Sequence, residues 1–268
     1  MFLARLLVLF SLVCISCAHS SFEQKQLKHA LDFATSNRLE LEILLQHYTY
    51  DSLKLEAAKF LIRNMPHCYS YQQGSEMDSV KRVRTYYSPF GQIDQTYARR
   101  WGHYTYRNLP KIYDAHIITA EYLIDNIDRA FDNWQKRPWN RSLSFEDFCE
   151  YLLPYRIGDE PLEEWRELYE KKYGYLLDSI YKGSDVVEAA NLVSRHLQEP
   201  VFIYCEDFEL PHIGPRYLFS HRYGSCVDAA DIVTYAFRAV GIPCMEDTDA
   251  RGGHVWNVVR DTTGRDVP

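Results

Sequence analysis

The sequence lacks the features that define several large classes of protein. With 12 glycines and 11 prolines in 268 residues it is not collagen-like, and 46% hydrophobic against 25% charged residues excludes a disordered chain. Apart from its first residues it has no long apolar run, which excludes a multi-span membrane protein. Acidic residues outnumber basic ones by 37 to 30, so the net charge of −7 is unlike that of a nucleic-acid-binding protein.

The N-terminus has the pattern of an export signal. Arg5 is its only charge, and the apolar run LLVLFSLVCIS follows. This run is too short for a membrane-spanning helix, which needs about 20 residues. Ser16 and Ala18 provide the small-x-small pattern of ordinary signal peptidase cleavage. Alternatively, Ser16-Cys17 resembles the end of a bacterial lipobox, in which Cys17 becomes the lipidated first residue, although Cys14 stands where Leu is usual.

The lipoprotein route is favoured because the polar stretch 18–26 resembles a short tether. We therefore predict an exported protein that is anchored in the cell envelope through a lipid on Cys17, or, by the other route, a secreted or periplasmic one. Residues 1–17 are predicted to be the signal peptide. Its removal takes Arg5 and no acid, so the mature charge becomes 29 − 37 = −8.

Seven cysteines raise the question of a disulfide scaffold or a metal site. Two belong to the export signal. The remaining five are Cys68, Cys149, Cys205, Cys226 and Cys244. They form no CxxC pair, and no histidine cluster with zinc-ligand spacing accompanies them, so we predict no metal and no cofactor. All but Cys226 are predicted to be packing residues, and export permits one bridge, with Cys205–Cys244 as the favoured pair.

Apolar residues repeat at helical spacing through much of residues 22–200, which predicts a helical region there. The predicted helices cover residues 26–48 with a break near Asn37, 52–65 with Ser52 as N-cap, 117–134, 144–152 with Ser144 as N-cap, 162–177, and 184–197 with Ser184 as N-cap. No internal repeat or low-complexity linker is present.

Residues 81–111 lose the helical period and interleave basic with aromatic side chains. Such a tract is able to stack single-stranded nucleic acid, sugar rings or peptide aromatics. Export argues against nucleic acid, so none is predicted as a partner. The tract is interpreted as a loop whose aromatics pack against helices, with a substrate rim as the alternative.

The residue types that carry chemistry lie in the last fifty residues. The segment YGSCVD ends a loop and opens an apolar helix, which the Gly-Ile-Pro turn closes, and HVWNVV is typical of a strand. Cys226 is therefore predicted at a helix N-terminus, where backbone N–H groups favour a thiolate and can hold an oxyanion. His254 follows Gly252 and Gly253 at the strand start and is predicted to be the general base and acid.

At these residues the sequence resembles the transglutaminase-like superfamily, whose fold is related to papain-like cysteine proteases. The resemblance rests on YGSCVDAADIVTYAFRAVGIPC and GGHVWN and covers residues 216–268. It implies an α+β fold: a helical region followed by a helix-plus-antiparallel-sheet core over 201–268. It also implies that Cys226 is the nucleophile and His254 its base. The upstream segments FCEYLLPYRIG and LEAAKFLIRNMP resemble those of exported bacterial proteins that carry this domain.

The third catalytic residue of the family, usually an Asp on the strand after the histidine strand, is not evident. Asp261 falls in a predicted turn, and Asp266 is the alternative. The favoured explanation is that the core is incomplete and the sequence stops at Pro268 before the orienting residue.

Two hypotheses of different class follow. The first is a thiol enzyme that uses Cys226 for acyl transfer or hydrolysis on a peptide, protein or other amide substrate. The second is a catalytically weak or inactive module that binds surface peptides or glycans.

Overall fold

The computed structural model describes residues 21–75, 77–78, 81, 106–199, 201–204 and 210–268. The predicted signal peptide with Cys17, most of the 81–111 tract and Cys205 lie outside the described residues. Within the described part, no helix combines the length and the apolar character needed to cross a membrane.

The chain begins with a group of helices that pack on one another. Residues 21–33 are helical, and the elements that follow are the 3-10 turn Thr35–Asn37, α2 Arg38–His47, α3 Ser52–Asn64 and the 3-10 turn Met65–His67. The break predicted near Asn37 is confirmed. The N-cap of α3 is Asp51 and not Ser52, because the Asp51 carboxylate accepts the N–H of Lys54 at 3.1 Å.

A second group of helices occupies the middle of the chain. It consists of α6 Ala120–Lys136, the 3-10 turn Pro138–Ser142, α7 Phe145–Tyr151, α8 Arg166–Tyr175, the π-turn Leu176–Ile180 and α9 Val186–Leu197. Ser144 caps α7 as predicted, and its Oγ accepts the N–H of Asp147 at 3.0 Å. The cap of α9 is Asp185 rather than Ser184, since its carboxylate accepts the N–H groups of Val187 and Glu188.

The helix predicted over 162–177 begins four residues late, at Arg166. The indole Nε1 of Trp165 donates to the carbonyl of Tyr155 at 2.9 Å. This contact holds the preceding residues against the loop at 154–161 instead of in a helical turn.

The strands of the described residues form three small sheets. β1 Tyr69–Tyr71 pairs antiparallel with β2 Lys111–Tyr113, and β3 Ile203–Tyr204 pairs parallel with β4 Tyr223–Gly224. β5 Cys244–Thr248, β6 Val255–Arg260 and β7 Asp266–Val267 form an antiparallel sheet in the order β5-β6-β7. The short helices of this part are the 3-10 turns Tyr106–Asn108 and Asp114–His116, and α10 Pro215–Ser220. The fold is therefore α+β, as predicted.

The helix predicted after YGS is α11, Cys226–Val240, and it is the central element of the C-terminal part. Gly241 ends it in the left-handed conformation, with φ of 84°. The predicted strand is β6, and the predicted turn is closed by the N–H of Gly264 and the carbonyl of Asp261 at 3.1 Å.

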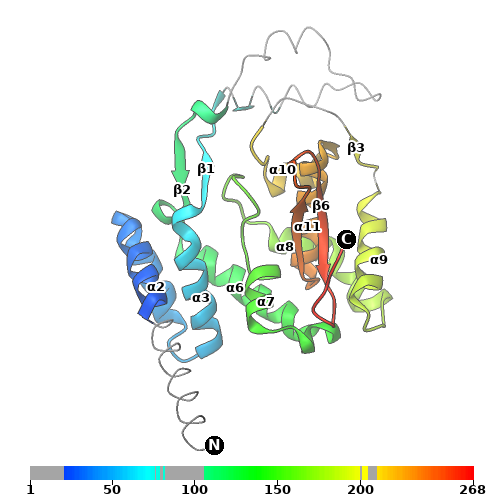
Figure 1. Cartoon of the computed structure of the whole chain (residues 1–268), viewed down its shortest axis with the longest axis horizontal. Coiled ribbons are helices and arrows are strands. Elements are labelled where there is room, and N and C mark those ends of the chain that lie inside the picture. The colour runs from blue at the N-terminus through cyan, green and yellow to red at the C-terminus, as the bar shows by residue number, and fades with distance from the viewer. Residues whose placement is uncertain (1–20, 76, 79–80, 82–105, 200, 205–209) are drawn as a thin grey trace, which may run out of the picture.

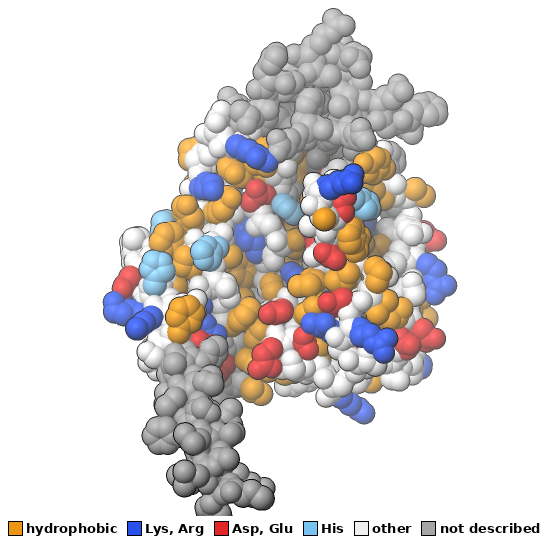
Figure 2. Space-filling view, viewed as in Figure 1, with side chains coloured by type: hydrophobic (Ala, Val, Ile, Leu, Met, Phe, Trp, Pro, Cys, Tyr) orange, Lys and Arg blue, Asp and Glu red, His pale blue; other side chains and the backbone are white. Residues whose placement is uncertain are grey.

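Two large apolar cores hold most of these elements together, and a small cluster of Tyr71, Met77 and Tyr106 lies beside β1. The first joins the helix at 21–33 to α2, α3, α6 and α7, with Leu41, Ile62 and Leu123 fully buried in it. The second joins α8 and α9 to α11 and the β5–β6 strands, around Tyr169 and Tyr235. In Figure 1 the helices α2 and α3 lie on one side of the molecule and α9, α11 and β6 lie on the other, with α6 and α7 between them. Acidic and basic side chains are mixed across the face in Figure 2.

Candidate functional site

Cys226 is the first residue of α11, as the sequence predicts, and its side chain is partly exposed. The turn before it is fixed by a capping box, in which the Asp228 carboxylate accepts the N–H of Ser225 at 2.8 Å. Gly224 has φ of 157°, and a Cβ there would lie 2.4 Å from Asp228 Oδ2. The glycine is therefore required for this helix start.

The register of the sheet determines what lies beside Cys226. β5 runs back from the end of α11 and β6 is antiparallel to β5, so β6 runs in the same direction as the helix. The Asn257 amide donates to the Ala230 carbonyl at 3.0 Å and to Thr234 Oγ1 at 2.8 Å. Since residues four apart share a helix face, Cys226 belongs to the stripe with Ala230 and Thr234 that faces β6.

His254 lies at the same end of this layer as Cys226. It precedes Asn257 by three residues, or about 10 Å of strand, while Cys226 precedes the Ala230–Thr234 contact by about 9 Å of helix. The imidazole is exposed and its centroid lies 6.0 Å from the Trp256 ring. Side chains alternate along a strand, so His254 shares the face of Trp256, opposite to Asn257 and its contact with α11. No hydrogen bond joins His254 to Cys226 among the described residues, and the structure does not bring the predicted pair together.

Neither predicted alternative for the third residue orients His254. The Asp261 carboxylate accepts N–H groups from Thr263 and Arg265 inside its own turn. Asp266 accepts the hydroxyl of Tyr151 at 2.9 Å and pairs with Arg260 at 3.2 Å, at the opposite end of β6 from His254. Asp261 is thus a turn residue, as predicted, and Asp266 stabilises the packing of β7.

The other described cysteines are free thiols: Cys149 and Cys244 are buried in the two apolar cores, as predicted, whereas Cys68 is half-buried and lines the cavity described below. Burial raises the pKa of Cys68 to about 11 and the pKa values of Cys149 and Cys244 to about 12. Cys244 is a free thiol, and Cys205, the other member of the predicted bridge, lies outside the described residues.

A histidine–carboxylate pair that the sequence analysis missed lies on another face of α11. Nδ1 of His212 lies 2.9 Å from Oδ1 of Asp231, and the backbone N–H of His212 donates to Asp159 at 2.9 Å. Asp231 is fully buried on α11, and Glu246 of β5 lies beside it. The only signal in the sequence is the acidic Asp231 in the middle of a mostly apolar helix, because His212 itself stands in a loop without a motif.

The titration of this cluster follows from its burial. Burial alone would lower the pKa of the His212 imidazole, but the charge of Asp231 and its hydrogen bond outweigh it and raise the pKa to about 10. Burial also raises the pKa of Glu246 to about 9, and the nearby Asp231 carboxylate adds to this shift. At neutral pH the cluster therefore holds an imidazolium–carboxylate pair beside a protonated glutamic acid.

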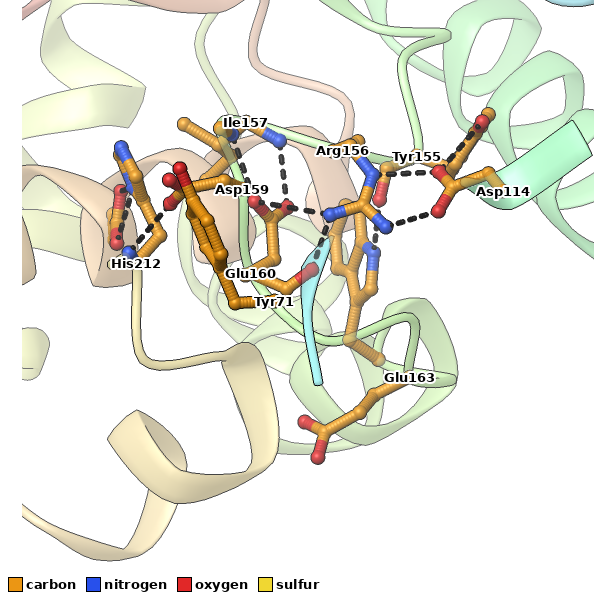
Figure 3. A network of polar contacts seen from close by, with 12 residues as sticks. Tyr71, Asp114, Tyr155, Arg156, Ile157, Asp159, Glu160, Glu163 and His212 are labelled. Atoms are coloured by element: carbon orange, nitrogen blue, oxygen red, sulfur yellow. Dashed lines mark hydrogen bonds and ion pairs between the residues drawn. The ribbon is translucent and has the colours of Figure 1, made fainter. Parts of the chain in front are cut away.

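The loop that faces His212 is built on a buried ion pair (Figure 3). Arg156 donates from Nε to Asp114 at 2.6 Å and from its second guanidinium arm to the other Asp114 oxygen. The Glu160 carboxylate accepts the N–H groups of Ile157 and Gly158, both at 2.7 Å. These bonds fix the backbone that carries Asp159 to the His212 N–H.

A cavity of about 770 Å³ lies between this loop, His212 and the start of α11. Ser225, Val227 and Asp228 contribute to its wall, whereas Cys226 does not. Tyr106, at the described end of the aromatic and basic tract, lines it as well, and its ring packs at 4.9 Å on that of Tyr71. Across the described ranges, no group of three His, Cys, Asp or Glu side chains is arranged to hold a metal ion.

No protein-family model, no curated protein and no solved structure matches this chain. The chemical interpretation therefore depends on the residues and the geometry given above.

Proposed function

We propose that the chain is a thiol-dependent enzyme that transfers or hydrolyses the acyl group of an amide substrate, with Cys226 as nucleophile and His254 as its acid–base partner. The observation that carries the proposal is the start of α11. A thiol stands there among unpaired backbone N–H groups, on the helix face that contacts the strand beginning just after His254.

The chemistry uses only these groups. The Cys226 thiolate attacks the amide carbonyl carbon, and the N–H groups of the first helical turn face the oxyanion that forms. The C–N bond breaks as His254 gives its proton to the leaving amine, which leaves a thioester on Cys226. Water or a second amine attacks the thioester carbonyl, His254 takes the proton of the attacking group, and the C–S bond breaks to release the Cys226 thiolate beside the protonated His254.

The two side chains must approach each other before this reaction. Catalytic hydrogen bonds are often long or absent without substrate and tighten in the substrate complex. The approach requires the loop before β6 to rearrange, since the His254 carbonyl accepts the N–H of Asp249 at 3.1 Å and the hydroxyl of Thr248 at 3.0 Å. Membership of the transglutaminase-like superfamily, export and lipid attachment at Cys17 remain part of the proposal.

Thiol reactivity in the full-length native protein tests the proposal. Iodoacetamide labelling at pH 6 to 8, followed by peptide mass spectrometry, gives one rate for each cysteine, with glutathione as the unactivated reference. A tenfold larger thiolate fraction raises the alkylation rate only about threefold, because the more acidic thiol gives a weaker nucleophile. An activated Cys226 should therefore be alkylated about threefold faster than glutathione, or more, at pH 6. This excess reports the helix start alone, because His254 makes no hydrogen bond to Cys226 in the described free protein.

The raised pKa values of Cys68, Cys149 and Cys244 make these thiols internal controls that react slowly. A Cys226 rate at or below that of glutathione across the pH range contradicts the activated thiolate.

A second candidate function has one observation in its favour: Cys226 is absent from the wall of the 770 Å³ cavity. A module that binds peptides or glycans in that cavity would keep its ligand when Cys226 is replaced by Ala. If Cys226→Ala binds its peptide or glycan ligand and supports the cellular role of the protein as well as the wild type does, the binding module is favoured. If the variant folds but no longer supports that role, the enzyme is favoured.

A further inference from the structure

The cavity and the Cys226 stripe lie on different faces of α11. Asp231 follows Cys226 by five residues, which rotates it by about 140° around the helix axis at 3.6 residues per turn. Val227 and Asp228, which line the cavity, lie on the Asp231 side. The cavity volume of about 770 Å³ is within the range of small-molecule sites, and Tyr69, Ile157 and Val227 give it apolar walls.

His212 presents one unused hydrogen-bond donor at this cavity. Asp231 holds Nδ1, and Asp159 holds the backbone N–H. Nε2 makes no hydrogen bond to any described residue. The edge of the ring lies against Gly158, where a Cβ would fall 2.4 Å from Nε2 and 2.3 Å from Cδ2. The imidazolium is therefore locked in orientation, with one N–H left for a ligand.

Most other charged groups around the cavity are already saturated by the protein. Arg156 is paired with Asp114 and donates to the Glu160 carbonyl, and the Asp228 carboxylate caps its own helix. Asp159 uses Oδ1 for the His212 N–H, and its second oxygen remains an acceptor. An acceptor and a donor thus stand next to each other, both fixed through His212.

The balance of charge selects among ligands. Asp231 cancels the charge of His212, while Asp159 and Asp228 leave the wall negative, which disfavours carboxylate and phosphate groups. An ammonium group would meet the Nε2–H donor. A neutral group that carries one acceptor and one donor matches the pair, and an amide has both.

We propose that this cavity binds a peptide segment, with Nε2–H of His212 donating to a backbone carbonyl and the Asp159 carboxylate accepting a backbone N–H. The inference deepens the proposed function, since it names a peptide as the amide substrate, and it assigns to His212 a binding role away from the reacting bond.

The test uses the full chain labelled with ¹⁵N-histidine at pH 7.5, in the wild type and in Cys226→Ala. The probes are N-acetyl-valine N-methylamide, acetate, n-butylamine and methyl glucoside. The His212 ring signals are assigned by their loss in His212→Gln. We expect the blocked amide to shift these signals saturably and more tightly than the other three probes. Because one hydrogen bond is worth about 1 kcal/mol, Asp159→Asn should weaken its binding about fivefold.

A steric variant provides a second measurement. Gly158→Ala should displace the ring and abolish the shift, whereas Gly74→Ala, whose Cβ would meet nothing within 4 Å, should leave it unchanged. Tighter binding of acetate, butylamine or glucoside than of the amide overturns the ligand assignment, and no shift with any probe overturns the site.

Binding to Cys226→Ala does not depend on catalysis. A reactive Cys226 without amide binding therefore contradicts only this inference, and amide binding with an unreactive Cys226 contradicts only the proposed enzyme.

Discussion

Replacing Arg166 by methionine tests how the loop beside the cavity is held in place. Arg166 is 4% exposed and has no carboxylate partner among the described residues. Its guanidinium instead donates to the Asn126 side chain and to the carbonyls of Leu152, Leu153, Pro154 and Arg238. Three of these carbonyls follow the last turn of α7, where helix carbonyls have no partner of their own and a positive charge is stabilising.

The magnitude follows from the acceptors that the substitution leaves. Leu153 keeps a hydrogen bond from Asn126 at 2.9 Å, but no other described residue donates to Leu152 or Pro154. The buried carbonyls of Leu152 and Arg238 are left without partners, at a cost of about 1–3 kcal/mol each, and the part-buried carbonyl of Pro154 costs less. Burial lowers the pKa of Arg166, which means that its charge is disfavoured in the folded protein. Replacing it by an apolar side chain therefore recovers part of the free energy lost at the carbonyls. We expect a net decrease of about 3 kcal/mol in the free energy of unfolding.

Urea unfolding followed by tryptophan fluorescence measures this decrease. Arg195→Met is the matched control, since Arg195 is exposed and, among the described residues, donates only to the Asn191 carbonyl of its own helix. It should change stability by less than about 0.5 kcal/mol. Arg166→Met that is as stable as the control, or more stable than the wild type, refutes the reasoning, because the guanidinium would then contribute no more than an apolar side chain of similar size.

Two further predictions concern stability. The pKa of His212 is raised to about 10 from 6.5, so the stabilisation it gives is complete below pH 6.5 and is lost as the pH rises through 10. His212→Gln should therefore be less stable than the wild type by about 2 kcal/mol or more at pH 6, and urea curves at pH 6 and 9.5 should show the gap closing; a gap that widens with pH contradicts the ion pair. Gly241→Ala places a Cβ 2.8 Å from the Asn133 carbonyl oxygen at φ of 84°, whereas Gly252→Ala meets nothing within 4 Å at φ of 68°. Thermal unfolding should show a loss of about 1 kcal/mol for Gly252→Ala and clearly more for Gly241→Ala, and equal losses would contradict the close packing.

The helix that begins at Cys226 was predictable because local signals agree along it. Ser225 and Asp228 have capping-box spacing, the residues between are apolar, and Gly241-Ile-Pro243 ends the helix. The starts of α3 and α9 were each misplaced by one residue. In both cases a serine stands next to an aspartate, and only the backbone geometry decides which side chain reaches the free N–H groups.

The cluster around His212 could not be predicted, because its members come from separate parts of the chain. Asp159, His212, Asp231 and Glu246 share no spacing, and their contacts exist only once the loop at 156–160 is tied to Asp114 by Arg156. For the same reason the sequence did not indicate that the buried Arg166 binds the carbonyls of the segment before this loop, or that Arg238 binds the Arg156 carbonyl within it. Nonlocal hydrogen bonds of this kind have no period in the sequence.

The two proposals together set a lower limit on the length of the substrate. Cys226 and Asp231 lie on faces of α11 about 140° apart, and a helix with its side chains is about 10 Å wide. A peptide bound at His212 and Asp159 must therefore extend about 10 Å around the helix start before an amide reaches the thiol, which takes about three extended residues. A single blocked amino acid fills the cavity without presenting a scissile bond to Cys226. Short amides are therefore expected to bind without being turned over. Turnover should begin only when the peptide extends about three residues beyond the cavity.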